Sequence, residues 1–187
     1  MNHGIEEFRS GIFALRTRRF GTVAELMIET LYELSAAQNQ FHDRFDDSAG
    51  QRVEVKFSTV MKACENPITI DNVVEECLKA NLSNRVLKSS EINDFKFDCN
   101  IQQIKPSEFD ILYYGLFFSD RIAIFKINSS EISSCPGYSD KQHKGNIGEG
   151  QFHLNMKTLP FHMENYFVQW LSYEELHQRF SSASSKK

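Results

Sequence analysis

The spacing of apolar residues predicts helices in the first part of the chain. Apolar side chains recur every three or four positions within residues 1–20 and again within residues 23–34. Side chains at that spacing lie on one side of a helix, so both segments are predicted to be amphipathic helices. Thr22 is expected to cap the second helix, with Glu25 three residues later completing a capping box.

After residue 40 the apolar pattern changes to a period of two. Residues 41–46 and 52–57 alternate apolar and polar side chains. Residues 47–50 between them (Asp-Ser-Ala-Gly) have the composition of a tight turn. We therefore predict that the two segments pair as an antiparallel hairpin.

Later segments supply the rest of an α/β fold. The nearly continuous apolar run of residues 109–118 is typical of a central strand with both faces covered. Residues 128–150 are predicted to form a long loop and residues 181–187 a flexible tail. Further predicted elements are strands at residues 98–104, 121–127 and 151–157, a helix at residues 72–80, and a last helix to about residue 180 that begins with a capping box at Ser172 and Glu175. Together these elements predict an α/β domain with a mixed central β-sheet flanked by helices.

Composition narrows the class of protein only modestly. The length of 187 residues suits a single domain, expected at residues 1–180. The chain has 21 Lys and Arg against 25 Asp and Glu, and the resulting net charge of −4 neither indicates nor excludes a nucleic-acid partner. No apolar run reaches the ~18 residues of a membrane span, and the charged residues 1–20 are unlike a secretory signal. The four cysteines form no CxxC pair, so we expect no structural zinc site and a cytoplasmic location.

The hairpin brings together side chains suited to metal-assisted chemistry. Glu54 and Lys56 are two positions apart on a predicted strand, so both project from one face. With the turn centred on residues 48 and 49, Asp43 lies opposite Glu54, with β-carbons ~5 Å apart. Two facing carboxylates repel each other unless a cation lies between them, and a nearby lysine can hold a phosphate oxygen or position a water. These are the groups that hydrolysis of a phosphodiester requires.

Other interpretations of the hairpin remain open. Asp46 and Asp47 are competing candidates for the metal-binding aspartate, because a register shift of one residue reverses the faces of a strand. Glu54 and Lys56 on either side of a valine would also suit an ordinary solvated strand face.

The order of these residues resembles a nuclease family. A predicted helix bearing Glu25 precedes the hairpin that carries Asp43, Glu54 and Lys56, the last two within the run Val-Glu-Val-Lys-Phe-Ser. This layout resembles the PD-(D/E)XK nuclease superfamily, and within it the type II restriction endonucleases. Residues 102–106 and 148–155 are also similar to stretches that follow the acid-x-lysine triplet in bacterial restriction enzymes. No proline precedes Asp43, where the motif that names the superfamily has one.

The resemblance implies a Mg²⁺-dependent endonuclease with a restriction endonuclease-like fold and a catalytic core at about residues 20–127. Asp43, Glu54 and the backbone carbonyl of Val55 would bind Mg²⁺. Lys56 would contact the scissile phosphate and the attacking water. Glu25 would hold a second metal or a metal-bound water, or would only close the capping box.

Residues 128–160 are the expected DNA-reading region. Side-chain amides suit adenine and basic side chains suit guanine. The candidate DNA-binding residues of this region are Lys141, Gln142, His143, Lys144, Gln151, His153, Asn155 and Lys157. The polar row on the strand would equally suit an amphipathic edge strand. Gln102 and Gln103 are candidates to support the active site from a neighbouring strand.

The expected partner is double-stranded DNA, cut at a short specific sequence. A palindromic target would call for a homodimer, because symmetry in the target is met by symmetry in the protein. Two other functions stay open, namely a structure-specific or repair DNA nuclease of the same fold and a non-catalytic DNA-binding module.

Overall fold

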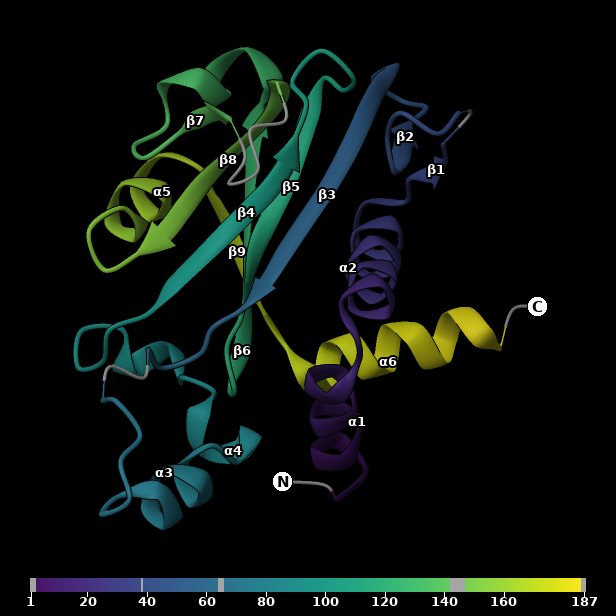
Figure 1. Cartoon of the computed structure of the whole chain (residues 1–187). Coiled ribbons are helices and arrows are strands. Elements are labelled where there is room, and N and C mark those ends of the chain that lie inside the picture. The colour runs from purple at the N-terminus through teal and green to yellow at the C-terminus, as the bar shows by residue number, and fades with distance from the viewer. Residues whose placement is uncertain (1–2, 38, 64–65, 142–146, 186–187) are drawn as a thin grey trace.

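The computed structural model describes residues 3–37, 39–63, 66–141 and 147–185 (Figure 1). The helices are α1 (His3–Ala14), α2 (Thr17–Tyr32), α3 (Val73–Lys79), α4 (Leu82–Arg85), α5 (Leu159–Asn165) and α6 (Tyr173–Ser184), with short 3-10 helices η1 (Ser89–Glu91) and η2 (Ser129–Ser134). The strands are β1 (Ser35–Ala36), β2 (Arg44–Asp46), β3 (Gln51–Thr59), β4 (Asp98–Ile104), β5 (Ile111–Phe117), β6 (Arg121–Asn128), β7 (Ser139–Lys141), β8 (Ile147–Asn155) and β9 (Phe167–Ser172).

A six-stranded sheet in the order β1-β2-β3-β5-β6-β9 forms the central layer. β3 and β5 are parallel and the other neighbours are antiparallel, so the sheet is mixed, as the sequence predicts. α1, α2 and α6 pack on one face of this sheet (Figure 1). A second sheet, in the order β4-β8-β7, packs with α5 against the other face. The prediction of an α/β domain with a mixed sheet flanked by helices is confirmed, and the second sheet is an addition.

The interior strands β3 and β5 have one face towards the helices and the other towards the second sheet. All residues of β5 are buried, which confirms the prediction of a central strand covered on both faces. In β3, Val53 and Val55 belong to the core beneath the helices. Because side chains alternate along a strand, Glu54 and Lys56 project from the opposite face, towards the second sheet.

The core between the two sheets contains His162 of α5, which is fully buried. Its Nδ1 lies 2.8 Å from the Tyr114 hydroxyl, and its ring stacks on Phe152 with centroids 5.3 Å apart. Burial lowers the pKa of His162 to about 4, so the imidazole is neutral at physiological pH.

The helix predicted at residues 23–34 begins earlier than expected. α2 starts at Thr17 after the extended residue Arg16, and the Thr22 hydroxyl donates within the helix to the Arg18 carbonyl (3.2 Å). The capping box at Thr22 is therefore wrong. The buried stripe of the helix already begins at Phe20, and packing of this side chain favours helix ahead of Thr22.

The long loop predicted at residues 128–150 is also wrong in part. η2, β7 and the first residues of β8 lie within it, and β8 pairs with β4 and β7, whereas residues 142–146 lie outside the described residues. Short polar strands of this kind are stabilised by their partners, so the sequence pattern alone does not predict them.

Several other predicted elements are confirmed. β4 covers residues 98–104, and β5 and β6 form the predicted hairpin. The Ser172–Glu175 capping box begins α6, which continues to Ser184, four residues past the predicted end at about residue 180, whereas residues 186–187 of the predicted tail lie outside the described residues. β9 and α5 were not predicted.

In the part of the chain that the structure describes, no helix combines the length and apolar character of a membrane span. The described cysteines are free thiols, of which Cys77 is exposed and Cys99 and Cys135 are buried.

Gly115 is the point of closest packing in β5. A Cβ at this position would overlap the Ala123 carbonyl oxygen of β6 and would lie 2.5 Å from Phe57 Cε1. We expect Gly115→Ala to lower the free energy of unfolding by about 1–3 kcal/mol, the range for an overpacked core. Denaturant titration measures this change. Gly21→Ala in α2, where a Cβ would meet no atom within 4 Å, is the matched control. It should raise stability by about 0.5–1 kcal/mol, and equal effects of the two substitutions would contradict the packing argument.

Candidate functional site

The candidate site is a polar cleft of about 210 Å³ beside the β2–β3 hairpin. The hairpin forms one side of it, and segments at the end of β4 and the start of β8 form the other. The residues that line the cleft are Gln40, Phe41, His42, Asp43, Glu54, Lys56, Gln103, Lys105, Glu108 and Glu149.

The hairpin register places Asp43 beside β3. β2 pairs with β3 in the predicted register, with Arg44 opposite Val53. Asp43 immediately precedes β2, and its N–H donates to the Val53 carbonyl (3.0 Å). Its carboxylate reaches across the hairpin, where Oδ2 accepts a hydrogen bond from the Val55 N–H (2.9 Å). This bond fixes the carboxylate at the centre of the triplet Glu54-Val55-Lys56.

The Lys56 ammonium contacts both carboxylates. Lys56 Nζ lies 3.4 Å from Asp43 Oδ2 and forms a close ion pair with Glu54 Oε1. The three side chains are 23%, 24% and 12% exposed for Lys56, Asp43 and Glu54, so solvent only partly screens their charges. The predicted convergence of two acids and one amine across the hairpin is therefore present.

The electrostatics of the three groups are interdependent. Burial raises the pKa of Glu54 to about 7, with a further upward contribution from Asp43 and an opposing one from Lys56. Burial by itself would lower the pKa of Lys56, but Glu54 and Asp43 outweigh it and raise that pKa above its ordinary value. Lys56 therefore keeps its positive charge between the two acids.

The competing aspartates have a different place in the hairpin. Asp46 Oδ1 accepts hydrogen bonds from the Ser48 N–H (3.0 Å), the Ser48 hydroxyl (2.6 Å) and the Ala49 N–H (3.1 Å). These bonds close the turn, and the Ser48 hydroxyl is the largest cause of the lowered pKa of Asp46. Asp47 is exposed within the same turn. Only Asp43, of the three, contacts Lys56.

Glu25 lies on α2 near this group but is bound elsewhere. Arg44 Nη1 lies 3.3 Å from Glu25 Oε2, and Arg44 Nε lies 2.7 Å from Glu29 Oε2. Burial, followed by the charge of Asp43, raises the pKa of Glu25. Arg44 is a residue that the sequence analysis missed, because its link between α2 and the hairpin depends on tertiary packing.

A second charged group faces the first across the cleft and was also missed. Lys105 Nζ lies 3.6 Å from Glu108 Oε1 and 3.6 Å from Glu149 Oε1. His42 is 6% exposed, and neither of its ring nitrogens has a hydrogen-bond partner among the described residues. No local sequence pattern indicates these positions, which lie far apart along the chain.

The carboxylates of the site suit a Mg²⁺ ion that is bound by only a few protein ligands and keeps most of its waters. In the described ranges, no cluster of three or more His, Cys, Asp or Glu side chains is suited to hold a metal ion. Mg²⁺ usually keeps several waters and needs only one or two carboxylates, which Asp43 and Glu54 can supply. One ammonium contacts both carboxylates, so the two acids face a common point beside β3.

The described DNA-reading residues of β8 lie beside β4, away from the cleft. Gln151 accepts a hydrogen bond from Asn100 (2.9 Å), and His153 Nδ1 lies 2.9 Å from Asp98. Asn155 accepts from the backbone of Lys157, whose side chain is exposed. Lys141 ends β7 and is exposed, whereas residues 142–144 lie outside the described residues. None of the described residues in this set lines the cleft at Glu54.

Comparison of the chain with protein-family models and with curated proteins finds no match.

Proposed function

We propose that this protein is a Mg²⁺-dependent type II restriction endonuclease that hydrolyses double-stranded DNA at a short specific sequence. The observation that carries the proposal is the convergence of Asp43, Glu54 and Lys56 across the hairpin. Two carboxylates and an amine in one half-buried cleft match the groups needed for phosphodiester hydrolysis.

Each residue has a distinct role in this proposal. Asp43, Glu54 and the Val55 carbonyl would hold Mg²⁺, which when bound would act as a Lewis acid on the phosphoryl oxygen and lower the pKa of water. The N–H and C=O of one strand residue point to the same edge, so the Val55 carbonyl lies on the side of Asp43. Lys56 holds a phosphate oxygen and orients the attacking water. Glu25, which now pairs with Arg44, would hold a second metal or a metal-bound water.

The order of elements supports a restriction endonuclease-like fold. α2 carries Glu25, the hairpin β2–β3 follows with the three central residues, and β5 continues the sheet in parallel with β3. The half-buried polar face of β4 and β8 is the proposed DNA-reading surface, and a second copy of the chain would complete a two-fold site on a palindrome.

Cleavage by the wild-type protein and its Lys56→Ala variant tests the function. Digestion of phage DNA with Mg²⁺ should give discrete bands on a gel, and chelation of Mg²⁺ should abolish them.

Lys56→Ala should lower the cleavage rate by about a hundredfold to a thousandfold with DNA binding nearly intact, because it removes stabilisation of the transition state. The control is Lys88→Ala, which removes an exposed lysine directly before η1 and should leave the cleavage rate unchanged. Cleavage of branched DNA alone would favour the repair-nuclease alternative, and full activity of Lys56→Ala would refute its catalytic role.

Paired substitutions distinguish the two aspartates. Asp43→Asn should abolish both Mg²⁺ binding and cleavage, because a neutral amide is a weak ligand for a hard cation. Asp46→Asn should retain cleavage and change the free energy of unfolding by less than about 1 kcal/mol, since the amide oxygen can still accept in the turn. Calorimetric titration with Mg²⁺ and thermal unfolding provide the two measurements. The assignment would be wrong if Asp46→Asn lost Mg²⁺ and Asp43→Asn kept it.

The raised pKa of Glu54 predicts a pH-dependent affinity for Mg²⁺. Because this pKa is about 7, a proton competes with Mg²⁺ for the carboxylate below that pH. The dissociation constant for Mg²⁺ should rise about tenfold per pH unit below 7 and level off above it. Titration calorimetry at pH 6, 7 and 8 measures this dependence. An affinity that stays constant from pH 6 to pH 8 would show that Glu54 does not bind the ion as a titrating ligand.

A further inference from the structure

A second pocket, of about 380 Å³, adjoins the cleft. Lys56 and Gln103 line both cavities, so whatever occupies the second pocket lies next to the amine of the candidate site. The volume is at the lower end of the range for small-molecule sites and suits one nucleotide. We call this cavity the amide pocket, after the side-chain amides of Asn100, Gln102 and Gln103 that line it.

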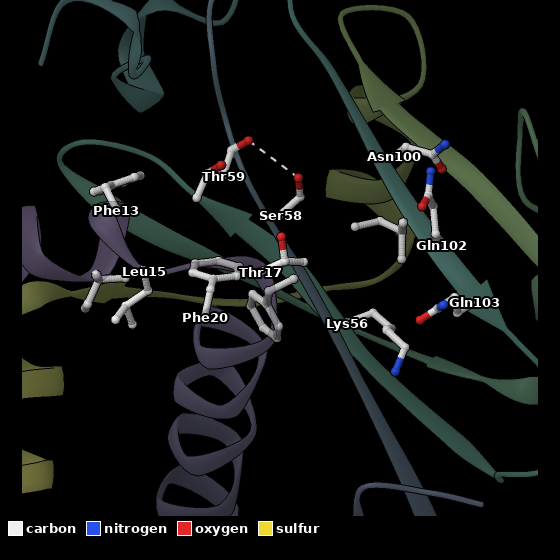
Figure 2. A pocket seen from close by; sticks show the side chains of 13 residues that line it. Phe13, Leu15, Thr17, Phe20, Lys56, Ser58, Thr59, Asn100, Gln102 and Gln103 are labelled. Atoms are coloured by element: carbon white, nitrogen blue, oxygen red, sulfur yellow. Dashed lines mark hydrogen bonds between the residues drawn. The ribbon is translucent and has the colours of Figure 1, made fainter. Parts of the chain in front are cut away.

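The two sides of the amide pocket differ in chemistry. Figure 2 shows Phe13, Leu15 and Phe20 on the side of the helices and the three amides of β4 on the other. Ser58 and Thr59 of β3 lie between the two sides. A ring-bearing apolar surface opposite donor and acceptor groups is the arrangement by which proteins hold a base outside the helical stack, with rings against its face and amides at its edge.

A β-bulge creates the amide side of the pocket. Ile101 pairs with Phe152 and Ile104 pairs with Gly150, so Gln102 and Gln103 together face one residue of β8. In a regular strand one of the two glutamines would turn inwards, but both are exposed between buried isoleucines.

Gln103 adopts a backbone conformation that favours glycine. Its φ is 59°, in the left-handed region, where a side chain other than glycine is strained. Such strain is found at functional sites, where it aims a side chain that a regular strand could not place. The strained backbone therefore lies at Gln103, whose side-chain amide lines the pocket together with Lys56.

We infer that the amide pocket binds a nucleobase that is turned out of the DNA helix beside the phosphate held by Lys56. This inference rests on the proposed function and assigns the chemical class that the neighbouring pocket accepts. Phe13, whose side chain is half-buried, packs with Leu15 against the face of the base, and Gln102 and Gln103 donate to and accept from its edge. A paired base within the stack cannot enter the pocket, so the substrate strand unstacks next to the cut.

Binding of deoxyadenosine 5′-monophosphate (dAMP) and of deoxyribose 5-phosphate tests the inference directly. In Mg²⁺, NMR titration with dAMP should shift resonances of Phe13, Gln102 and Gln103, whereas the base-free compound should shift only resonances around Lys56. dAMP should bind about tenfold more tightly, because stacking of the base adds to the contact with the phosphate. Equal affinities and equal shifts for the two compounds would overturn the inference.

Gln103→Gly separates recognition from structure. Glycine relieves the positive φ, so the melting temperature should stay the same or rise. Loss of the amide should weaken dAMP binding about tenfold and leave deoxyribose 5-phosphate binding unchanged. The control is Gln178→Ala, at an exposed position of α6, which should leave the binding of both compounds unchanged. Unchanged dAMP binding by Gln103→Gly would show that the bulge is only structural.

A DNA duplex with 2-aminopurine next to the cut site tests the unstacking of the base. Emission should rise several-fold when the cleavage-deficient Lys56→Ala variant binds, because 2-aminopurine fluoresces more strongly outside the stack. Cleavage of DNA with no rise in emission and no preference for dAMP would overturn the inference and leave the nuclease proposal intact. Preference for dAMP without any cleavage of DNA would support the base pocket and overturn the nuclease proposal.

Discussion

The ion pairs of Lys56 with Asp43 and Glu54 organise the candidate site. With both acids ionised, the group carries two negative charges and one positive charge in a half-buried cleft, and this balance favours the entry of one further cation. The amine limits repulsion between the two acids, and the acids keep the amine charged despite burial. Lys56 thus favours the ionised form of Glu54, and the two acids favour the ionised form of Lys56, which phosphate contact requires.

Strand β3 makes this arrangement compatible with a stable fold. Its valines fill the core under the helices while Glu54 and Lys56 face the second sheet. The chemical groups therefore lie on one of the best-anchored strands, between a hairpin partner and the buried strand β5. This placement fixes the backbone at the site more firmly than a loop would.

Local rules predicted the part of the site that local geometry determines. The turn at residues 47–50 fixed the register, and the period of two fixed the shared face of Glu54 and Lys56. The start of α2 was misplaced because packing of Phe20 outweighs a capping signal at Thr22. The charged group of Lys105, the contacts of Arg44 and the bulge in β4 depend on segments far apart along the chain, so no window of sequence contains them.

The aromatic packing between the two sheets has a consequence for the mouth of the cleft. One wall belongs to β3 and the opposite wall to the β4 and β8 segments, and Tyr114, Phe152 and the neutral His162 lie between these layers as a rigid spacer. The size of these interior rings contributes to the separation of the two layers. On the proposed function, substitutions that resize the rings would change the width of the cleft without altering any residue that lines it.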